Sequence, residues 1–183
     1  MLNKSAHAVA EAVKRYALPA DTITLHNNGL KPKECILMID SFTKHYQQVQ
    51  NLTISKNKLG LEGAKRLAVA LADMKVLSKL VLSDDEIGDM GISEIINSCR
   101  SYCSLEYLDI SGNNIGKSSA AGELAENMNM FLSNNRTIEV LKMNWNSMRA
   151  ATAEKIIDGL IYCGGIKELH LNNNLLGVSY DDK

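Results

Sequence analysis

Histidines, carboxylates and cysteines are the side chains in this sequence that could do chemistry. His26 and His170 stand near opposite ends of the chain, with Asp109 between them. Nucleophilic catalysis needs a serine or cysteine beside a base and a donor for the oxyanion, and no local motif groups such residues here. The acidic run "SDDEIG", residues 83–88, together with Asp109, has oxygens that suit a hard cation such as Ca²⁺. Acids on an exposed turn are usually solvated, so we expect no metal site there.

The cysteines are Cys35, Cys99, Cys103 and Cys163. Cys99 and Cys103 are one helical turn apart, but no Cys-x-x-Cys motif or nearby histidine completes a zinc site. We therefore expect buried, reduced thiols, with neither a bound metal nor another cofactor.

One sequence pattern recurs six times and must position all of these side chains. An apolar residue is followed by apolar residues at +3 and +5, by asparagine at +8 and by an apolar residue at +10. The +8 positions are separated by 29, 28, 28, 33 and 28 residues; they are Asn28, Asn57, Asp85, Asn113, Asn146 and Asn174. A period in this range predicts a solenoid, because one unit can bury its apolar face only against its neighbours.

The pattern L-x-x-L-x-L-x-x-N-x-L, with a helix in each repeat of about 28 residues, resembles the leucine-rich repeat. The run "LGLEGAKRLAVAL", from Leu59 to Leu71, is similar to the helical phrase of the ribonuclease-inhibitor-like subclass. The resemblance covers almost the whole chain. It implies an α/β solenoid, or horseshoe, of six strand–turn–helix repeats, with a parallel sheet on the concave face and helices on the convex face.

We expect one continuous domain that begins with a capping helix. Residues 1–19 form the cap, with a helix over 5–16 whose apolar stripe is Val9, Val13 and Tyr16, and residues 20–183 hold the six repeats. Five additional residues in the fourth repeat predict a helix longer by more than a turn. Strands are expected near 22–26, 51–55, 79–83, 107–111, 140–144 and 168–172, and later helices near 32–46, 61–74, 89–101, 118–134 and 150–163.

The repeated asparagine ends each strand where the backbone must turn, and its amide can both accept from and donate to backbone groups there. An ionised aspartate can only accept. At Asp85 we therefore expect a looser turn or one completed by water.

The composition argues against nucleic acid and membranes as partners. Lys and Arg total 20 against 21 Asp and Glu, and this formal net charge of −1 attracts no polyanion. No apolar run reaches the length of a membrane span, and residues 1–18 lack the apolar stretch of a secretory signal. These features favour a cytoplasmic protein, with a cilium or cytoskeletal assembly and an organellar matrix as alternatives.

The variable strand positions project from the concave face and form columns across the repeats. The early repeats contribute small neutral side chains there, whereas the later ones gather aromatic and charged residues. Tyr and Trp anchor many protein interfaces, although Trp145 could instead cover the junction of the fourth and fifth repeats. The expected partner-binding residues are Tyr107, Asp109, Lys142, Asn144, Trp145, Glu168 and His170.

The sixth repeat offers a second candidate surface, the C-terminal edge formed by Ile166, Leu169 and Leu171. The sequence "GVSYDDK" follows its turn where a helix would be expected. A longer array, a frayed end and a docking surface all remain open as explanations. An exposed strand edge offers main-chain pairing as well as apolar contact, which favours docking or self-association at this edge.

These observations favour protein binding over catalysis. His26 and His170 belong to the first and last repeats, and strands spaced by about 4.8 Å keep them from meeting. The leading hypothesis is a non-catalytic interaction or scaffold module for a protein partner, for example as a subunit of a large assembly. The alternative is a regulator of an enzyme such as a small GTPase, to which the chain would contribute residues in trans.

Overall fold

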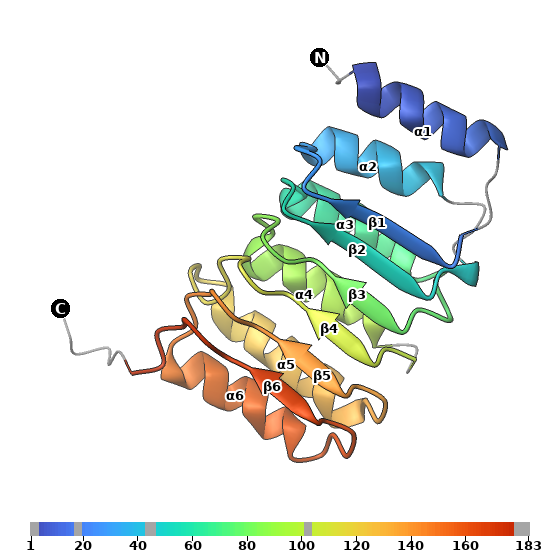
Figure 1. The fold of residues 1–183 in the computed structure, drawn as a ribbon. Helices are drawn as coiled ribbons and strands as arrows, with labels where there is room; N and C mark the ends of the chain where they lie inside the picture. Colours follow the sequence, from blue (N-terminus) through green and yellow to red (C-terminus); the bar gives the residue numbers. More distant parts are fainter. Residues whose placement is uncertain (1–3, 17–19, 43–46, 101–103, 178–183) are drawn as a thin grey trace.

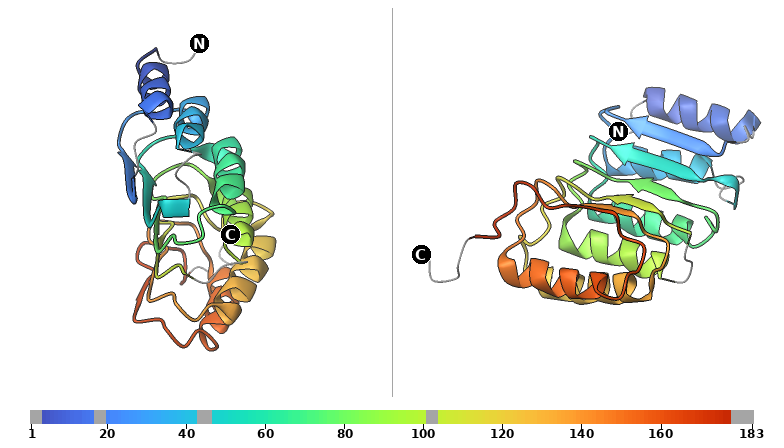
Figure 2. Two further views of the ribbon diagram at one scale, coloured as in Figure 1. Left: turned by 90° about the vertical axis from the view of Figure 1, so that its right-hand side faces the viewer. Right: turned by 60° about the horizontal axis from the view of Figure 1, so that its bottom comes forward.

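A computed structural model describes residues 4–16, 20–42, 47–100 and 104–177. In these residues α-helices and strands alternate, and the six strands form one parallel sheet in the order β1 to β6. The helices lie in a second layer along the outer face of the curved sheet (Figures 1 and 2). This confirms the predicted repeat solenoid. The elements are α1 (Lys4–Tyr16), β1 (Thr22–His26), α2 (Pro32–Ser41), β2 (Asn51–Ser55), α3 (Gly60–Leu71), β3 (Lys79–Val81), α4 (Gly88–Cys99), β4 (Tyr107–Asp109), α5 (Ala121–Asn134), β5 (Val140–Lys142), α6 (Ala150–Leu160) and β6 (Glu168–His170).

The strand register aligns the repeats as the sequence pattern predicts. The first column runs through Thr22, Asn51, Lys79, Tyr107, Val140 and Glu168. β1 and β2 have the expected five residues, whereas the later strands have three. Backbone pairing nevertheless continues past β3, because the N–H of Asp84 donates to the Ser111 carbonyl at 2.9 Å. Asp84 adopts a left-handed φ of 60°, as Asn27 and Lys56 do at the same place after β1 and β2, so the turn after the strand is alike in these repeats.

The inward strand positions and the inner helix faces form one continuous core. Leu80, Leu108 and Leu141 are completely buried, and so are Leu67 and Leu71 of α3. No single repeat could cover these side chains, so burial couples each repeat to the next.

The repeated asparagine joins neighbouring turns into a hydrogen-bonded ladder. The Asn57 side chain accepts from the N–H groups of Asn28 and Leu30, both at 3.1 Å, through its Oδ1. Its Nδ2 donates to the carbonyls of Leu25 at 2.6 Å and Ser55 at 3.1 Å. Each asparagine therefore closes its own strand end and the turn of the preceding repeat. The same pattern recurs at Asn113 and Asn146. Asn174 donates in the same way but accepts only the Met148 N–H among the described residues.

Asp85 departs from this ladder. Its Oδ1 accepts the Asn57 N–H at 2.9 Å, but its buried Oδ2 has no hydrogen-bond partner among the described residues. The side chain is fully buried, and this burial raises the pKa of its carboxyl to about 7, with a smaller contribution from the charge of Asp84. The aspartate thus accepts one of the two kinds of N–H that Asn57 accepts at the same position, and it lacks the two bonds that the Asn57 amide donates.

The fourth repeat differs from its prediction. α5 has 14 residues against 12 in α4, so the helix is not longer by more than a turn. Most of the additional residues extend the loop before α5. Asp89, in the first turn of α4, binds this loop through hydrogen bonds. The buried Asp89 carboxylate accepts from the N–H of Gly116 at 2.7 Å, and from the N–H and hydroxyl of Ser118 at 2.9 and 2.7 Å. Gly116 has a φ of +87°, and a Cβ there would lie 2.7 Å from the Met148 backbone.

The predicted apolar stripe of the first helix is wrong in part. Ala6 and Ala10 are buried and Val13 is half-buried, whereas Val9 and Tyr16 are exposed. Small side chains suit this face because α1 packs alongside α2, and they allow the two helices to approach closely. Val9 lies instead beside a hollow between α1 and β1.

Candidate protein-binding surface

Tyr107 lies at the centre of the later concave surface. The ammonium groups of Lys79 and Lys142, from the strands on either side, lie 4.9 and 5.3 Å from the centroid of its ring. Cation–π attraction of this kind contributes about 0.5–1 kcal/mol at exposed sites. A hydrogen bond to the Tyr107 hydroxyl raises the pKa of Lys142, and the charges of Asp109 and Glu168 contribute further. The Tyr107 ring therefore lies between two bases, each of which it attracts weakly.

Acids and bases alternate around this ring. Asp109 pairs in register with Lys142, and its Oδ1 accepts the Ser111 N–H at 3.0 Å. Glu168 accepts from His170 at 3.1 Å when the imidazole nitrogen carries a proton. The surface therefore combines both signs of charge and suits a polar protein surface better than a polyanion.

Trp145 projects from the turn after β5. Its backbone has a left-handed φ of 53°, and its N–H donates to the Asn172 carbonyl at 2.8 Å. The indole is 68 % exposed, so it does not cover the junction beneath it as the packing alternative required. An exposed aromatic on a hydrogen-bonded turn is a suitable interface anchor.

Asn144 has a structural part in this surface. Its N–H donates to the Ser111 hydroxyl at 3.1 Å, and its Oδ1 accepts the Asn172 N–H at 2.9 Å. It therefore joins three adjacent repeats along the third column of strand positions, which runs through His26, Ser55, Ser83, Ser111, Asn144 and Asn172. Lys79 belongs to this surface, although the sequence analysis did not predict it. Its position beside Tyr107 in the first column could have indicated this.

The predicted C-terminal edge is partly exposed. Leu169 is 38 % exposed, whereas the equivalent Leu141 of the preceding repeat is fully buried. Ile166 and Leu171 are half-buried.

A serine–histidine pair occurs on the early concave surface, although the sequence did not suggest one. His26 Nδ1 lies 2.7 Å from Ser55 Oγ, because the two residues are neighbours in the third column. Ser55 is only 2 % exposed, and no carboxylate of the described chain bonds the imidazole of His26. His170 lies five strands away, about 24 Å at the usual strand spacing. The pair therefore lacks the access and the third group that catalysis requires.

The acidic run does not converge on a common point. Asp85 faces the core, Asp89 holds the loop before α5, and Glu86 pairs with Lys58 at 3.1 Å. No group of three or more metal-binding side chains occurs within the described ranges.

The cysteines are buried where the structure describes them: Cys35, Cys99 and Cys163 are buried, whereas Cys103 lies outside the described ranges. Burial raises the pKa of the Cys35 thiol to about 12, which disfavours the thiolate.

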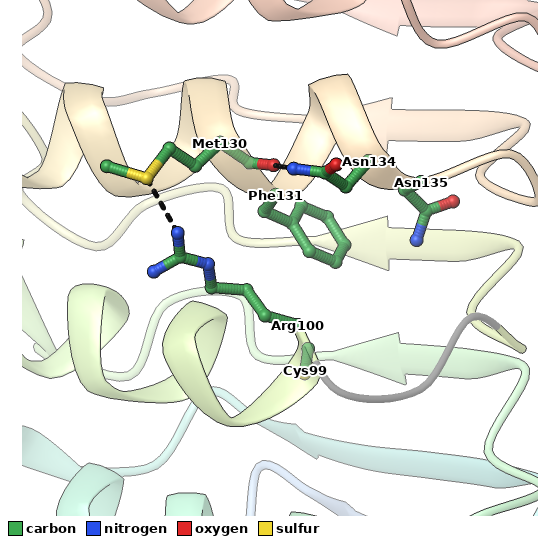
Figure 3. A pocket seen from close by; sticks show the side chains of 6 residues that line it. All are labelled: Cys99, Arg100, Met130, Phe131, Asn134 and Asn135. Carbon is green, nitrogen blue, oxygen red and sulfur yellow. Dashed lines mark hydrogen bonds between the residues drawn. The ribbon is translucent and has the colours of Figure 1, made fainter.

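Two hollows lie at the surface of the described chain, and neither resembles an active site. Figure 3 shows a depression of about 90 Å³ between the C-terminal ends of α4 and α5, where Arg100 points towards the Met130 sulfur. Asn135 lines it and uses its Oδ1 to accept from Thr137 and Ile138. A larger hollow of about 330 Å³ lies between α1 and β1.

Within the described part of the chain, no helix has the length and apolar character needed to cross a bilayer.

Comparisons with known proteins agree with this geometry. Residues 103–121 match the family model described as Leucine Rich repeat. RAN GTPase-activating protein 2 of Arabidopsis thaliana is 27 % identical over 93 residues, which are 50 % of this chain and 17 % of that protein. The chain therefore matches about a sixth of the length of this curated relative.

Two solved structures share the fold. The tropomodulin C-terminal domain of Caenorhabditis elegans has a TM-score of 0.67 at 9 % identity, with 87 % of this chain and 93 % of that one covered. A structure titled Leiomodin-1 Actin-Binding Site 2 has a TM-score of 0.65 at 17 % identity, with 84 % and 86 % covered. The chain has the leucine-rich repeat fold, as the repeats, the parallel sheet and these two structures together show.

Proposed function

We propose that this leucine-rich repeat protein is a non-catalytic module that binds a protein partner on the concave face of its later repeats. The observation that carries the proposal is the presence of two aromatic residues on the later repeats: the exposed Trp145 on the turn after β5, and the Tyr107 ring of β4 between the ammonium groups of two lysines. Large aromatic residues in a fixed position lose little conformational freedom on binding and bury much area, which is why they dominate interface energetics. The proposed contact residues are Tyr107, Asp109, Lys142, Trp145, Glu168 and His170, with Asn144 and Lys79 supporting them.

A matched pair of variants tests this proposal. A partner is first isolated with the wild-type chain, and its affinity for Trp145→Ala and Thr24→Ala is then measured. Thr24 is an exposed concave residue of β1, distant from the proposed patch. Equal affinities for two folded variants would refute the assignment of the later repeats.

The C-terminal edge is the second proposed contact surface. Ile166, Leu169 and Leu171 supply its apolar part. We also propose a cytoplasmic setting, with a cytoskeletal assembly as the alternative.

A regulator of a small GTPase is the second candidate function. The similarity to a protein named as a RAN GTPase-activating protein favours it over other enzyme regulators. Single-turnover GTP hydrolysis by Ran, measured with and without this chain, separates the two functions. An accelerated rate would support the regulator, and an unchanged rate together with partner binding would support the non-catalytic module.

A further inference from the structure

A row of left-handed turn residues follows the carboxyl ends of the strands and forms one rim of the concave face. Each member has a φ between 53° and 67°; the row is Asn27, Lys56, Asp84, Gly112, Trp145 and Asn173. The N–H groups of Asp84 and Gly112 donate to carbonyls of the following repeat at 2.9 Å, and that of Trp145 does so at 2.8 Å. The backbone of the row is therefore fixed, with one position for each strand.

Trp145 fits its position in this row poorly. Left-handed φ values crowd the Cβ atom, so Gly, Asn and Asp adopt them most easily, and these residue types occupy four of the six positions. Trp145 is the bulkiest member, and because its side chain is 68 % exposed, burial does not offset the strain. A strained and exposed aromatic residue indicates a role in binding rather than in folding.

Asp84 and Gly112 lie along the rim on one side of Trp145. The Asp84 carboxylate extends over Gly112: a Cβ atom on Gly112 would collide with Asp84 Oδ1 and lie 3.3 Å from the Asp84 Cα. Neighbouring strands are about 4.8 Å apart, so Asp84 and Trp145 are separated by about 10 Å, with the carboxylate over the position between them. A single side chain from another protein can therefore contact both the carboxylate and the indole.

The Asp84 carboxylate is available for such a contact. Asp84 is exposed, and its carboxylate makes no ion pair or side-chain hydrogen bond with the residues that the structure describes. Lys56, the preceding member of the row, does not pair with it in that part of the chain. Glu86 differs in this respect, because it pairs with Lys58 at 3.1 Å.

A carboxylate and an indole have a cation as their common ligand. A carboxylate accepts two parallel hydrogen bonds from a guanidinium, and the face of an indole attracts a cation within about 6 Å. Arginine meets both requirements with one planar group, because its N–H fork binds the acid while its face stacks on the ring. Lysine is a compact and strongly hydrated charge without a stacking face, so arginine is favoured.

We infer that Asp84, Gly112 and Trp145 form a site for an arginine side chain of the protein partner. The inference rests on the proposed function and names a chemical group that the partner supplies. It also assigns a contact to Asp84, which the proposed concave surface does not include. The site belongs to interior repeats, since β2 precedes the strands that carry it and β6 follows them.

Nuclear magnetic resonance tests the site with a defined probe and without a partner. Trp145 is the only tryptophan of the sequence, so its indole N–H gives one assignable resonance. The full chain, labelled with ¹⁵N, is titrated with N-acetyl-arginine methylamide and, separately, with the citrulline analogue, which has nearly the same shape and no charge. The wild type is expected to bind the arginine probe at least about threefold more tightly, through the ion pair and the cation–π contact.

Two aspartate variants make this titration specific. Asp84→Asn should lose the preference for the arginine probe. Asp73→Asn should keep it, because Asp73 is an exposed aspartate on the turn after α3, at the opposite ends of the strands. Equal responses of the wild type to both probes, or an Asp84→Asn chain that retains the preference, would overturn the inference.

A stability measurement separates a binding role of Trp145 from a structural one. Trp145→Asn introduces the residue type found at positions 27 and 173 of the same row. Relief of the strain should raise the thermal midpoint by about 2–4 °C. A lower midpoint would show that the indole stabilises the turn and would count against the site.

A double-mutant cycle with the isolated partner completes the test. Trp145→Ala and Asp84→Asn should each weaken binding, and the double variant should lose less than the product of the two factors, because one arginine contacts both residues. If Trp145→Ala weakens binding while Asp84→Asn binds as tightly as Asp73→Asn, the inference fails and the proposed function stands. If both single variants keep full affinity, both are refuted.

Discussion

Replacing Asp85 by asparagine is the sharpest test of the ladder, because it restores the donor that the other repeats have. Asp85 is fully buried, and its Oδ2 has no partner in the described residues. Asn113, at the equivalent position, donates from its amide to the carbonyls of Ile110 and Ser111. Asp85→Asn should gain such bonds and remove a buried carboxyl at the same time.

The expected magnitude depends on pH. Burial raises the pKa of Asp85 from 3.8 to about 7. Because the folded state binds the proton more tightly than the unfolded chain, this contribution to stability is complete below pH 3.8 and is lost as the pH rises through about 7. At about 1.4 kcal/mol per pH unit, the loss is at most about 4 kcal/mol. We expect Asp85→Asn to be more stable than the wild type by about 2–4 kcal/mol at pH 8 and by less than about 1 kcal/mol at pH 4.

Urea unfolding of both proteins at pH 4, 6 and 8 measures this difference, since contributions from all other titrating groups cancel between them. Glu86→Gln is the matched control, because Glu86 is the exposed acid next in sequence and pairs with Lys58 on the surface. It should change the free energy of unfolding by less than about 1 kcal/mol at each pH. A difference between Asp85→Asn and the wild type that does not grow with pH would refute the reasoning.

Three further predictions follow from the packing and the surface. Leu80→Ala should cost about 2–5 kcal/mol through lost contacts and a cavity, and an unchanged thermal midpoint would show that Leu80 does not couple the repeats. Trp145→Ala should weaken partner binding by about 2 kcal/mol or more in calorimetry, whereas Thr24→Ala should leave it nearly unchanged. Asp89→Ala should increase amide exchange at Gly116 and Ser118 selectively, and equal exchange in both proteins would contradict the role of Asp89 in holding that loop.

The repeat pattern was sufficient to predict the elements, the register and the core. Every strand starts at the predicted residue, because the apolar positions at +3 and +5 must face the core and the turn follows at the asparagine. The helix of the fourth repeat was mispredicted, since an insertion can extend either a helix or the loop before it. The deciding residue, Asp89, acts on a loop one repeat away and leaves no local signature.

The candidate surface was only partly predictable. Column alignment correctly placed Lys79 beside Tyr107 and Asp109 beside Lys142. It did not single out Lys79 as a contact residue, because side-chain direction decides which bases reach the ring. The contact between His26 and Ser55 was available from the same alignment and was missed. The exposure of Trp145 depends on the left-handed turn that carries it, which residue spacing alone does not specify.

Photo-crosslinking tests the central claim, binding on the later concave surface, most directly. A photoreactive phenylalanine analogue is placed at Tyr107 on the concave face, and in a second protein at the exposed Val69 on the convex face. The account predicts a discrete adduct with the isolated partner from position 107 and none from position 69. An adduct from position 69 alone would place the partner on the helical face and contradict the account.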